Sequence, residues 1–129
     1  MSKLRPSGER GQDVVEFAII FTVLFLVLMG IFDMGRAIYS SSVLFNAARE
    51  GARYGIIHPT DTAGIKAQVL NLAVGLDPNA LTVTSSLPDK NDVQVNLSYK
   101  FTIVTPIIQA FFGSNQLMLV SESTMRIEK

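Results

Sequence analysis

The chain has 129 residues, enough for one domain of ordinary size, and its eleven basic residues balance eleven acidic ones. A formal net charge of zero, without a basic stripe interleaved with aromatic residues, argues against nucleic-acid binding. The absence of cysteine excludes disulfides, thiolate metal sites and cysteine nucleophiles, so we expect packing to supply the stability.

A polar segment opens the chain, and a long apolar stretch follows it. We interpret residues 1–11 as a leader peptide and residues 14–32 as a transmembrane segment, close to the length of about 20 residues that a spanning helix needs. A dozen Phe, Ile, Leu and Val side chains in residues 17–32 contribute roughly −4 to −7 kcal/mol to insertion. The carboxylate of Glu16 opposes this with at most about +3 kcal/mol, so we predict that the segment inserts.

The distribution of basic residues predicts the orientation in the membrane. Lys3, Arg5 and Arg10 precede the apolar segment, and only Arg36 lies in the first turns after it. The short N-terminus is therefore expected in the cytoplasm and the rest of the chain outside it. A cleavable secretory signal is the alternative, but the only small-x-small sequence beyond the run contains that arginine.

Helical periodicity continues beyond the apolar segment. We predict one long helix over residues 12–55, with an apolar first half and an amphipathic second half. The apolar face of the second half is expected to contain Met34, Ile38, Phe45, Ala48 and Ala52, and the wet face Asn46, Arg49, Glu50 and Arg53. Asp33 with Arg36, and Glu50 with Arg53, are spaced three apart and are interpreted as solvated pairs.

Residues 56–129 have the pattern of a small extracytoplasmic α+β head. A short helix is expected from Thr62, with Ile65, Val69, Leu72 and Leu76 on its apolar face. Alternating apolar and polar residues then predict three antiparallel strands, with a turn at residues 88–91 and a helical turn at residues 106–113. The second half of the long helix should cover the sheet, giving a pilin-like α+β fold.

Several motifs resemble those of one protein family. They are Arg10-Gly11-Gln12, Val15-Glu16-Phe17, the apolar run to Gly30-Ile31-Phe32-Asp33-Met34-Gly35-Arg36-Ala37, the block from Asn46 to Gly55, and Ser123-Thr124-Met125-Arg126-Ile127-Glu128. Together they resemble the TadE-like pseudopilins of tight-adherence (Flp, type IV-like) pilus systems. The block from Asn46 to Gly55 is the specific part, since an apolar helix with an early glutamate also occurs by chance.

The resemblance implies a processing site and a set of partners. A membrane aspartic prepilin peptidase would cut after Gly11, leaving Gln12 as the new N-terminus, with Glu16 as its fifth residue and Phe17 next to it. The implied partners are membrane lipid, other pilin or pseudopilin subunits and the inner-membrane assembly platform. The implied location is the bacterial cytoplasmic membrane as a single-pass protein, and the extracellular pilus after assembly.

Glu16 is the residue that we expect to act in assembly. An intramembrane carboxylate is costly and by default marks function, and the freed α-amine of Gln12 is its expected partner. The alternative is that Glu16 merely reaches the lipid headgroups. Ala47, Gly51 and Gly55 form a small-residue stripe, for which close packing on the chain's own sheet is favoured over a subunit interface.

The function that best fits these patterns is that of a minor pseudopilin in pilus initiation, assembly or stability. Two alternatives remain: the main polymerising subunit of a filament, and an uncleaved, membrane-anchored binding module. An enzyme is disfavoured because no nucleophile, phosphate loop or zinc signature is found. One histidine, His58, without cysteines makes a metal site improbable, and no cofactor or small-molecule substrate is expected.

Overall fold

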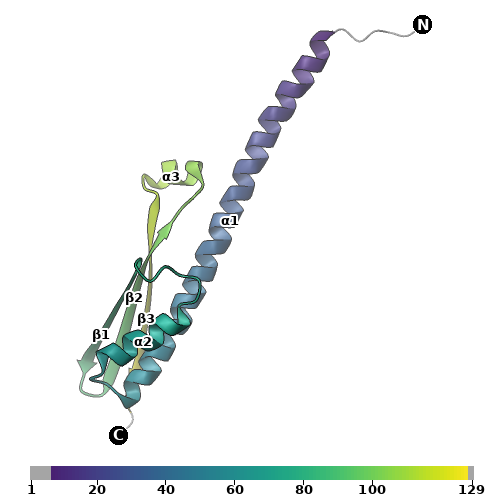
Figure 1. Cartoon of the computed structure of the whole chain (residues 1–129). Coiled ribbons are helices and arrows are strands. Elements are labelled where there is room, and N and C mark those ends of the chain that lie inside the picture. Colours follow the sequence, from purple (N-terminus) through teal and green to yellow (C-terminus); the bar gives the residue numbers. More distant parts are fainter. Residues whose placement is uncertain (1–6, 128–129) are drawn as a thin grey trace.

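The structure is a computed structural model that describes residues 7–127, with side chains from residue 11 onward. The predicted leader residues Lys3 and Arg5, the side chain of Arg10, and Glu128 of the last motif lie outside the described part. The elements in chain order are α1 (Ser7–Ile57), α2 (Thr62–Leu72), β1 (Leu81–Asp89), β2 (Asp92–Thr102), α3 (Pro106–Phe112) and β3 (Gln116–Arg126) (Figure 1). The predicted α+β, pilin-like fold is confirmed.

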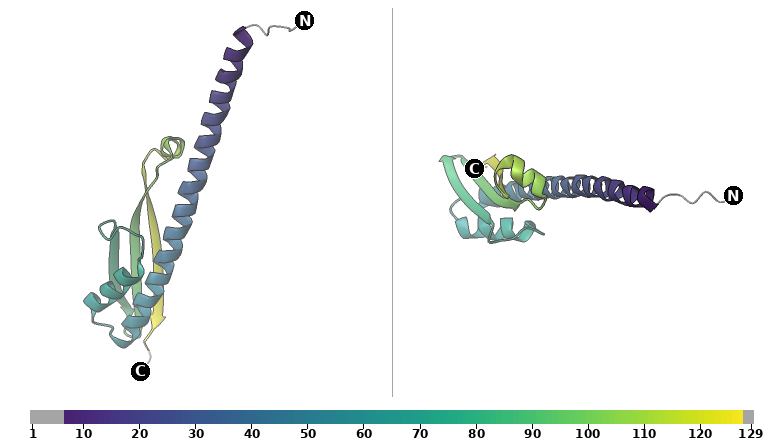
Figure 2. Two further views of the ribbon diagram at one scale, coloured as in Figure 1. Left: turned by 45° about the vertical axis from the view of Figure 1, so that its right-hand side comes forward. Right: turned by 90° about the horizontal axis from the view of Figure 1, so that it is seen from above.

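Helix α1 has 51 residues, which corresponds to a length of about 77 Å. Its N-terminal part projects beyond the rest of the molecule, and its C-terminal part lies along the sheet (Figures 1 and 2). We call residues 14–32 the stem, and α2, the sheet and α3 together the head. The helix extends beyond the predicted range of residues 12–55 at both ends, and the assignment of residues 1–11 as a leader stays a prediction.

The three strands form one antiparallel sheet in the order β1-β2-β3. A two-residue turn at Lys90 and Asn91 joins β1 to β2, and the register shifts between Ser86 and Asp89, where Pro88 cannot donate to the ladder. Strand β2 pairs with β3 along its whole length, from Asp92 opposite Arg126 to Thr102 opposite Gln116. The connection between β2 and β3 contains α3, which therefore lies at one end of the sheet (Figure 1).

The core lies between α1, α2 and the inner face of the sheet. Alternate residues of β2 point toward the helices, and Val93, Val95 and Leu97 are almost completely buried there. The polar residues between them face outward, as the period of two predicts. In α2, Ile65 and Val69 are buried as expected, whereas Leu72 is 43% exposed and Ala73 takes its place in the core.

Small residues, and not the large ones that we expected, line the packing face of α1. Ala48 and Ala52 are buried as predicted, but Met34, Ile38 and Phe45 are 66%, 60% and 52% exposed. The true face consists of Ser40, Leu44, Ala47, Ala48, Gly51, Ala52 and Gly55. Small side chains allow the axis of α1 to approach the sheet closely, and larger ones would hold the helix away.

Candidate membrane and assembly segment

The stem is the most apolar surface of the described chain. Apart from Leu26 and Met29, which are half-buried, its large apolar side chains from Val14 to Phe32 are 44–72% exposed, because the head does not cover them. Within residues 11–57, α1 contains a segment that is long and apolar enough to cross a membrane. An exposed apolar surface of this length is unfavourable in water and indicates a membrane anchor or a contact with other apolar helices.

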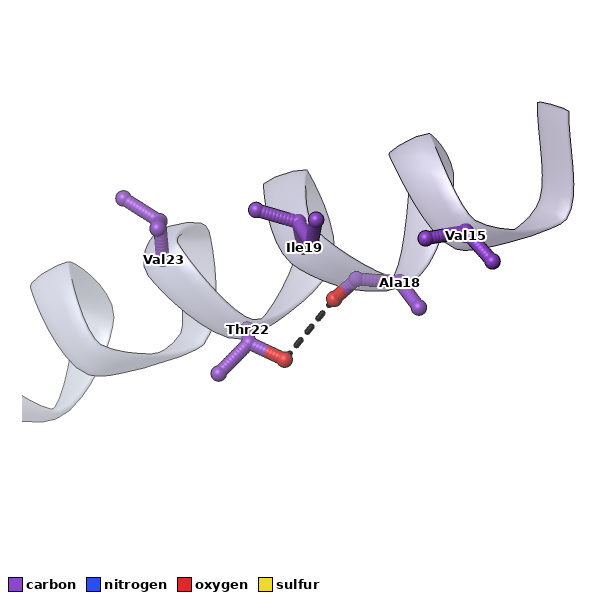
Figure 3. Close-up of a pocket in the computed structure, with 5 residues that line it drawn as sticks. All are labelled: Val15, Ala18, Ile19, Thr22 and Val23. Carbon is purple, nitrogen blue, oxygen red and sulfur yellow. Dashed lines mark hydrogen bonds between the residues drawn. The ribbon is translucent and has the colours of Figure 1, made fainter. Parts of the chain in front are cut away.

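One hydroxyl group interrupts the stem, and the helix itself satisfies it. The Thr22 hydroxyl donates to the carbonyl oxygen of Ala18, one turn earlier, at 2.8 Å (Figure 3). Because this bond is internal, Thr22 does not present an unpaired polar group to lipid. Ala18 and Thr22 also line a shallow groove together with Val15, Ile19 and Val23 (Figure 3).

The four predicted processing and assembly residues lie at the beginning of this surface. Gly11, Gln12, Glu16 and Phe17 all belong to α1 and are exposed to solvent. Gln12 and Glu16 are one helical turn apart, so their side chains share one face of the helix. The Gly11–Gln12 bond itself lies within continuous helix, and a Cβ atom added at Gly11 would contact nothing within 4 Å.

The small-residue stripe lies at the contact between α1 and the head. Ala47 is fully buried, and a Cβ atom added to Gly51 would lie 2.7 Å from Cγ2 of Val69. A Cβ atom on Gly55 would likewise lie 2.7 Å from Cγ1 of Val93. The stripe therefore packs against α2 and β2 of its own chain and is not available to another subunit.

Asp33 is the residue whose role we predicted wrongly. It is 5% exposed, whereas a solvated pair with Arg36 was expected. Its Oδ2 atom accepts hydrogen bonds from the backbone N–H groups of Val104, at 2.9 Å, and Thr105, at 2.7 Å. Its Oδ1 atom accepts one from Nη1 of Arg36 at 3.1 Å. Asp33 thus fixes the segment before α3 to the point where the stem enters the head.

These contacts determine the charge of Asp33. Burial raises the pKa of its carboxyl group, but the hydrogen bonds from Thr105 and Val104, with the Arg36 guanidinium, lower it more. The resulting pKa lies below the ordinary value of 3.8. The hydroxyl oxygen of Thr105 is buried beside this site without a hydrogen-bond partner.

A second polar contact lies at the C-terminal end of α1. The short helix begins at Thr62 as expected, and Asp61 caps it, because its Oδ1 atom accepts from the N–H of Gly64 at 2.9 Å. Its Oδ2 atom accepts from the Tyr54 hydroxyl at 2.9 Å. These two bonds lower the pKa of Asp61, and the shared bond raises the pKa of Tyr54. This cluster connects α1 to α2, so the shifted pKa values of Asp61 and Tyr54 have a structural explanation.

The remaining candidate residues are at the surface. His58 is exposed and stacks on Tyr54 with ring centroids 4.7 Å apart. Glu50 and Arg53 form an exposed pair at 3.9 Å, as expected of a solvated pair. Within residues 11–127, no group of three or more His, Cys, Asp or Glu residues is placed to hold a metal ion.

Comparison with known proteins gives one family. The model of the family described as TadE-like protein matches residues 11–53, which comprise the stem and most of the helix that packs on the head. No curated protein matches the chain. No solved structure matches it either. Residues 11–53, an apolar stem that continues into the helix packed against a pilin-like head, are thus similar to the TadE-like family over that segment of the chain.

Proposed function

We propose that this chain is a minor pseudopilin of a tight-adherence (Flp-type) pilus. Its stem first anchors the subunit in the cytoplasmic membrane, with the head outside, and later packs among the stems of neighbouring subunits. The observation that carries the proposal is the stem, which projects from the head on a TadE-like helix with its large apolar side chains exposed. Both lipid and a bundle of apolar helices can cover such a surface.

Processing is the first step of this function. A prepilin peptidase cuts between Gly11 and Gln12, and helix α1 must open locally before this bond can enter an active site. The position favours opening, because the bond lies near the N-terminal end of α1, where helices fray, and glycine is a poor helix former. Nothing packs against Gly11, so opening there breaks no tertiary contact of the described chain.

Cleavage changes the electrostatics of the stem. It frees the α-amine of Gln12 one turn away from Glu16, and it removes the basic leader residues. The amine, together with the positive end of the helix dipole, offsets the cost of placing the Glu16 carboxylate among apolar side chains. A pair between this amine and Glu16, of the same or an adjacent subunit, then defines the axial register of the stems.

The size of the head favours a minor role over that of the main filament subunit. The head accounts for about half of the chain and forms a hydrophobic core with the C-terminal part of α1, whereas a main subunit of this pilus type is expected to consist mostly of stem. Quantifying the chain in sheared pili tests this choice. A few copies per filament support the minor role, and a stoichiometry equal to that of the filament body contradicts it.

The decisive experiment is the intact mass of the membrane-extracted protein, with and without an active prepilin peptidase. We expect a chain that begins at Gln12 with the peptidase and an uncut chain without it. Gly11→Leu should block the cut, and Gly35→Leu is the matched control, because Gly35 lies in the same helix and a Cβ atom added there would also meet nothing within 4 Å. An uncut chain in the presence of active peptidase would overturn the proposal and favour a permanently anchored module.

A further inference from the structure

The tip of the head has an unusual surface. Helix α3 has no buried residue, and Ile107, Phe111 and Phe112 are 58%, 87% and 60% exposed. Met118 and Val120, on the adjoining strand, are also more than half exposed. No charged side chain occurs in residues 101–121, which include all of α3. A soluble domain rarely gathers so many exposed apolar side chains in one place, so this surface requires a partner.

The position of α3 along the stem identifies that partner. A Cβ atom on Gly30 would lie 3.7 Å from Cδ1 of Ile108, and a groove of about 260 Å³ separates α3 from Val23 and Val27. Helix α3 therefore lies beside residues 23–30 (Figures 1 and 2). In an upright helix these residues are about 3 to 14 Å from Phe32, and one leaflet contains roughly 15 Å of hydrocarbon.

The tip cannot leave this level without breaking contacts. The Asp33 carboxylate binds the N–H groups of Val104 and Thr105, directly before α3. On the other side, strand β3 pairs with β2 up to Gln116 opposite Thr102. When the stem spans a bilayer, α3 is therefore held at the level of the acyl chains on the side of the head.

The polar groups of the tip are suited to an apolar environment. Pro106, at the start of α3, has no N–H group to satisfy. Nε2 of Gln109 donates to the carbonyl oxygen of Ile103 at 2.7 Å, and the N–H of Ile103 donates to the carbonyl of Asn115 at 2.9 Å. The Ser114 hydroxyl donates to the carbonyl oxygen of Gln116. Internal pairing of this kind lowers the cost of transfer from water to lipid.

We propose that α3 is a second membrane contact, which inserts Ile107, Phe111 and Phe112 among the phospholipid acyl chains of the leaflet facing the head. An acyl chain also fits the apolar cavity of about 450 Å³ between α1, α3 and the end of the sheet. The subunit is thus attached by a spanning stem and by an apolar tip, which together set the tilt and rotation of the head above the membrane. The proposal rests on the membrane anchor of the proposed function and does not depend on assembly into a pilus.

Site-directed labelling tests the depth of α3 directly, because the chain has no cysteine of its own. The full-length protein is reconstituted in phosphatidylethanolamine–phosphatidylglycerol vesicles with one bimane-labelled cysteine, and quenching by lipids spin-labelled along the acyl chain is measured. Phe111→Cys is the test position, and Phe25→Cys in the stem is the positive control. Lys90→Cys, in the turn at the opposite end of the sheet, is the negative control. Each of these side chains is exposed, so the labels leave the core intact.

We expect the label at Phe111 to be quenched by acyl-chain spin labels to at least half the extent seen at Phe25. The same cysteine should react at least tenfold more slowly with a membrane-impermeant maleimide than the cysteine at Lys90. Quenching and reactivity equal to those at Lys90 would overturn the proposal. Protection that disappears on dilution of the protein in the bilayer would also overturn it, because the tip would then be covered by a neighbouring stem.

Discussion

The carboxylate of Asp33 and the backbone N–H of Thr105 lie 72 residues apart in sequence and form a hydrogen bond of 2.7 Å. This bond joins the end of the stem to the start of α3, and Arg36 holds the same carboxylate from the other side. Arg36 in turn lies over the ring of Phe101, with its Cζ atom 5.1 Å from the ring centroid. One buried acidic side chain thus attaches the apolar tip to α1, while the pairing of β2 with β3 holds the tip on its other side.

The first prediction is that Asp33→Ala releases the tip. Two backbone N–H groups lose their acceptor, and leaving the buried one, on Thr105, unpaired costs about 1–3 kcal/mol. We expect hydrogen exchange at Val104 and Thr105 to accelerate at least tenfold in detergent micelles, while Val95 in the core of β2 stays protected. Glu50→Ala is the matched control, because it removes a carboxylate from an exposed pair and should change nothing measurable. Unchanged exchange in Asp33→Ala would contradict the role of this residue.

The second prediction concerns pH. Because the folded-state pKa of Asp33 is lowered, its stabilising contribution is complete above the unfolded value of 3.8 and is lost as the pH falls through the lower, folded-state value. We therefore expect the tip to stay attached from pH 8 to pH 5 and to loosen only below about pH 3.8. An environment-sensitive label at Phe111→Cys, in detergent micelles, reports the change.

The pH experiment needs a variant that separates Asp33 from Asp61, since the pKa of Asp61 is also lowered. Asp33→Asn keeps the shape of the side chain and cannot titrate. In this variant the acid transition at the tip should disappear, while any transition at the Tyr54–Asp61 contact remains. A transition of equal size in both proteins would assign the pH dependence to another group.

The sequence predicted those features that depend on local patterns. The stem follows from a continuous apolar run, and the strands follow from alternation, as in Val93, Val95 and Leu97. These signals are local. A membrane requires every residue of the spanning segment to be apolar, and a sheet with one buried face requires apolar and polar residues to alternate along each strand. The fold class could therefore be predicted before the structure was known.

The features that the sequence did not reveal depend on partners distant in the chain. Asp33 looks like half of a surface pair until the connection at Val104 is placed against it. We predicted the packing face of α1 from the size and polarity of its side chains. The sheet and α2 approach α1 so closely that Gly51 lies in the contact, whereas Phe45 is exposed. The depth of α3 likewise depends on how far the sheet extends along α1, which no pattern within residues 106–112 encodes.

The third prediction tests this close approach. In Gly51→Ala the added methyl group would lie 2.7 Å from Cγ2 of Val69, which is fully buried and cannot move freely. Overpacking costs about 1–3 kcal/mol, and the better helix propensity of alanine returns up to about 1 kcal/mol. We expect a net loss of about 1 kcal/mol in the free energy of unfolding. The measurement is thermal unfolding in micelles, followed by the near-ultraviolet circular dichroism of the tyrosines.

Two further variants make the test of Gly51 specific. Gly35→Ala receives the same methyl group where nothing lies within 4 Å, so it should be neutral or slightly stabilising. Combining Gly51→Ala with Val69→Ala provides room for the new methyl group. The double variant should therefore lose less free energy of unfolding than the sum of the two single variants. Additive losses would show that the methyl group does not meet Val69.

The last prediction separates the charge of Glu16 from its position. Glu16→Gln keeps the size of the side chain but cannot pair electrostatically with the α-amine of Gln12. Membrane insertion should persist, because loss of a carboxylate makes the stem more apolar, whereas incorporation into sheared pili should fall at least tenfold. Asp13→Asn is the matched control: it makes the same chemical change at an exposed position of the same helix.

Processing is followed by intact mass in all variants, so that loss of assembly is not confused with loss of cleavage. Normal incorporation of Glu16→Gln would end the assignment of Glu16 to assembly, and equal defects in both variants would show that net charge near the N-terminus matters, not this one carboxylate.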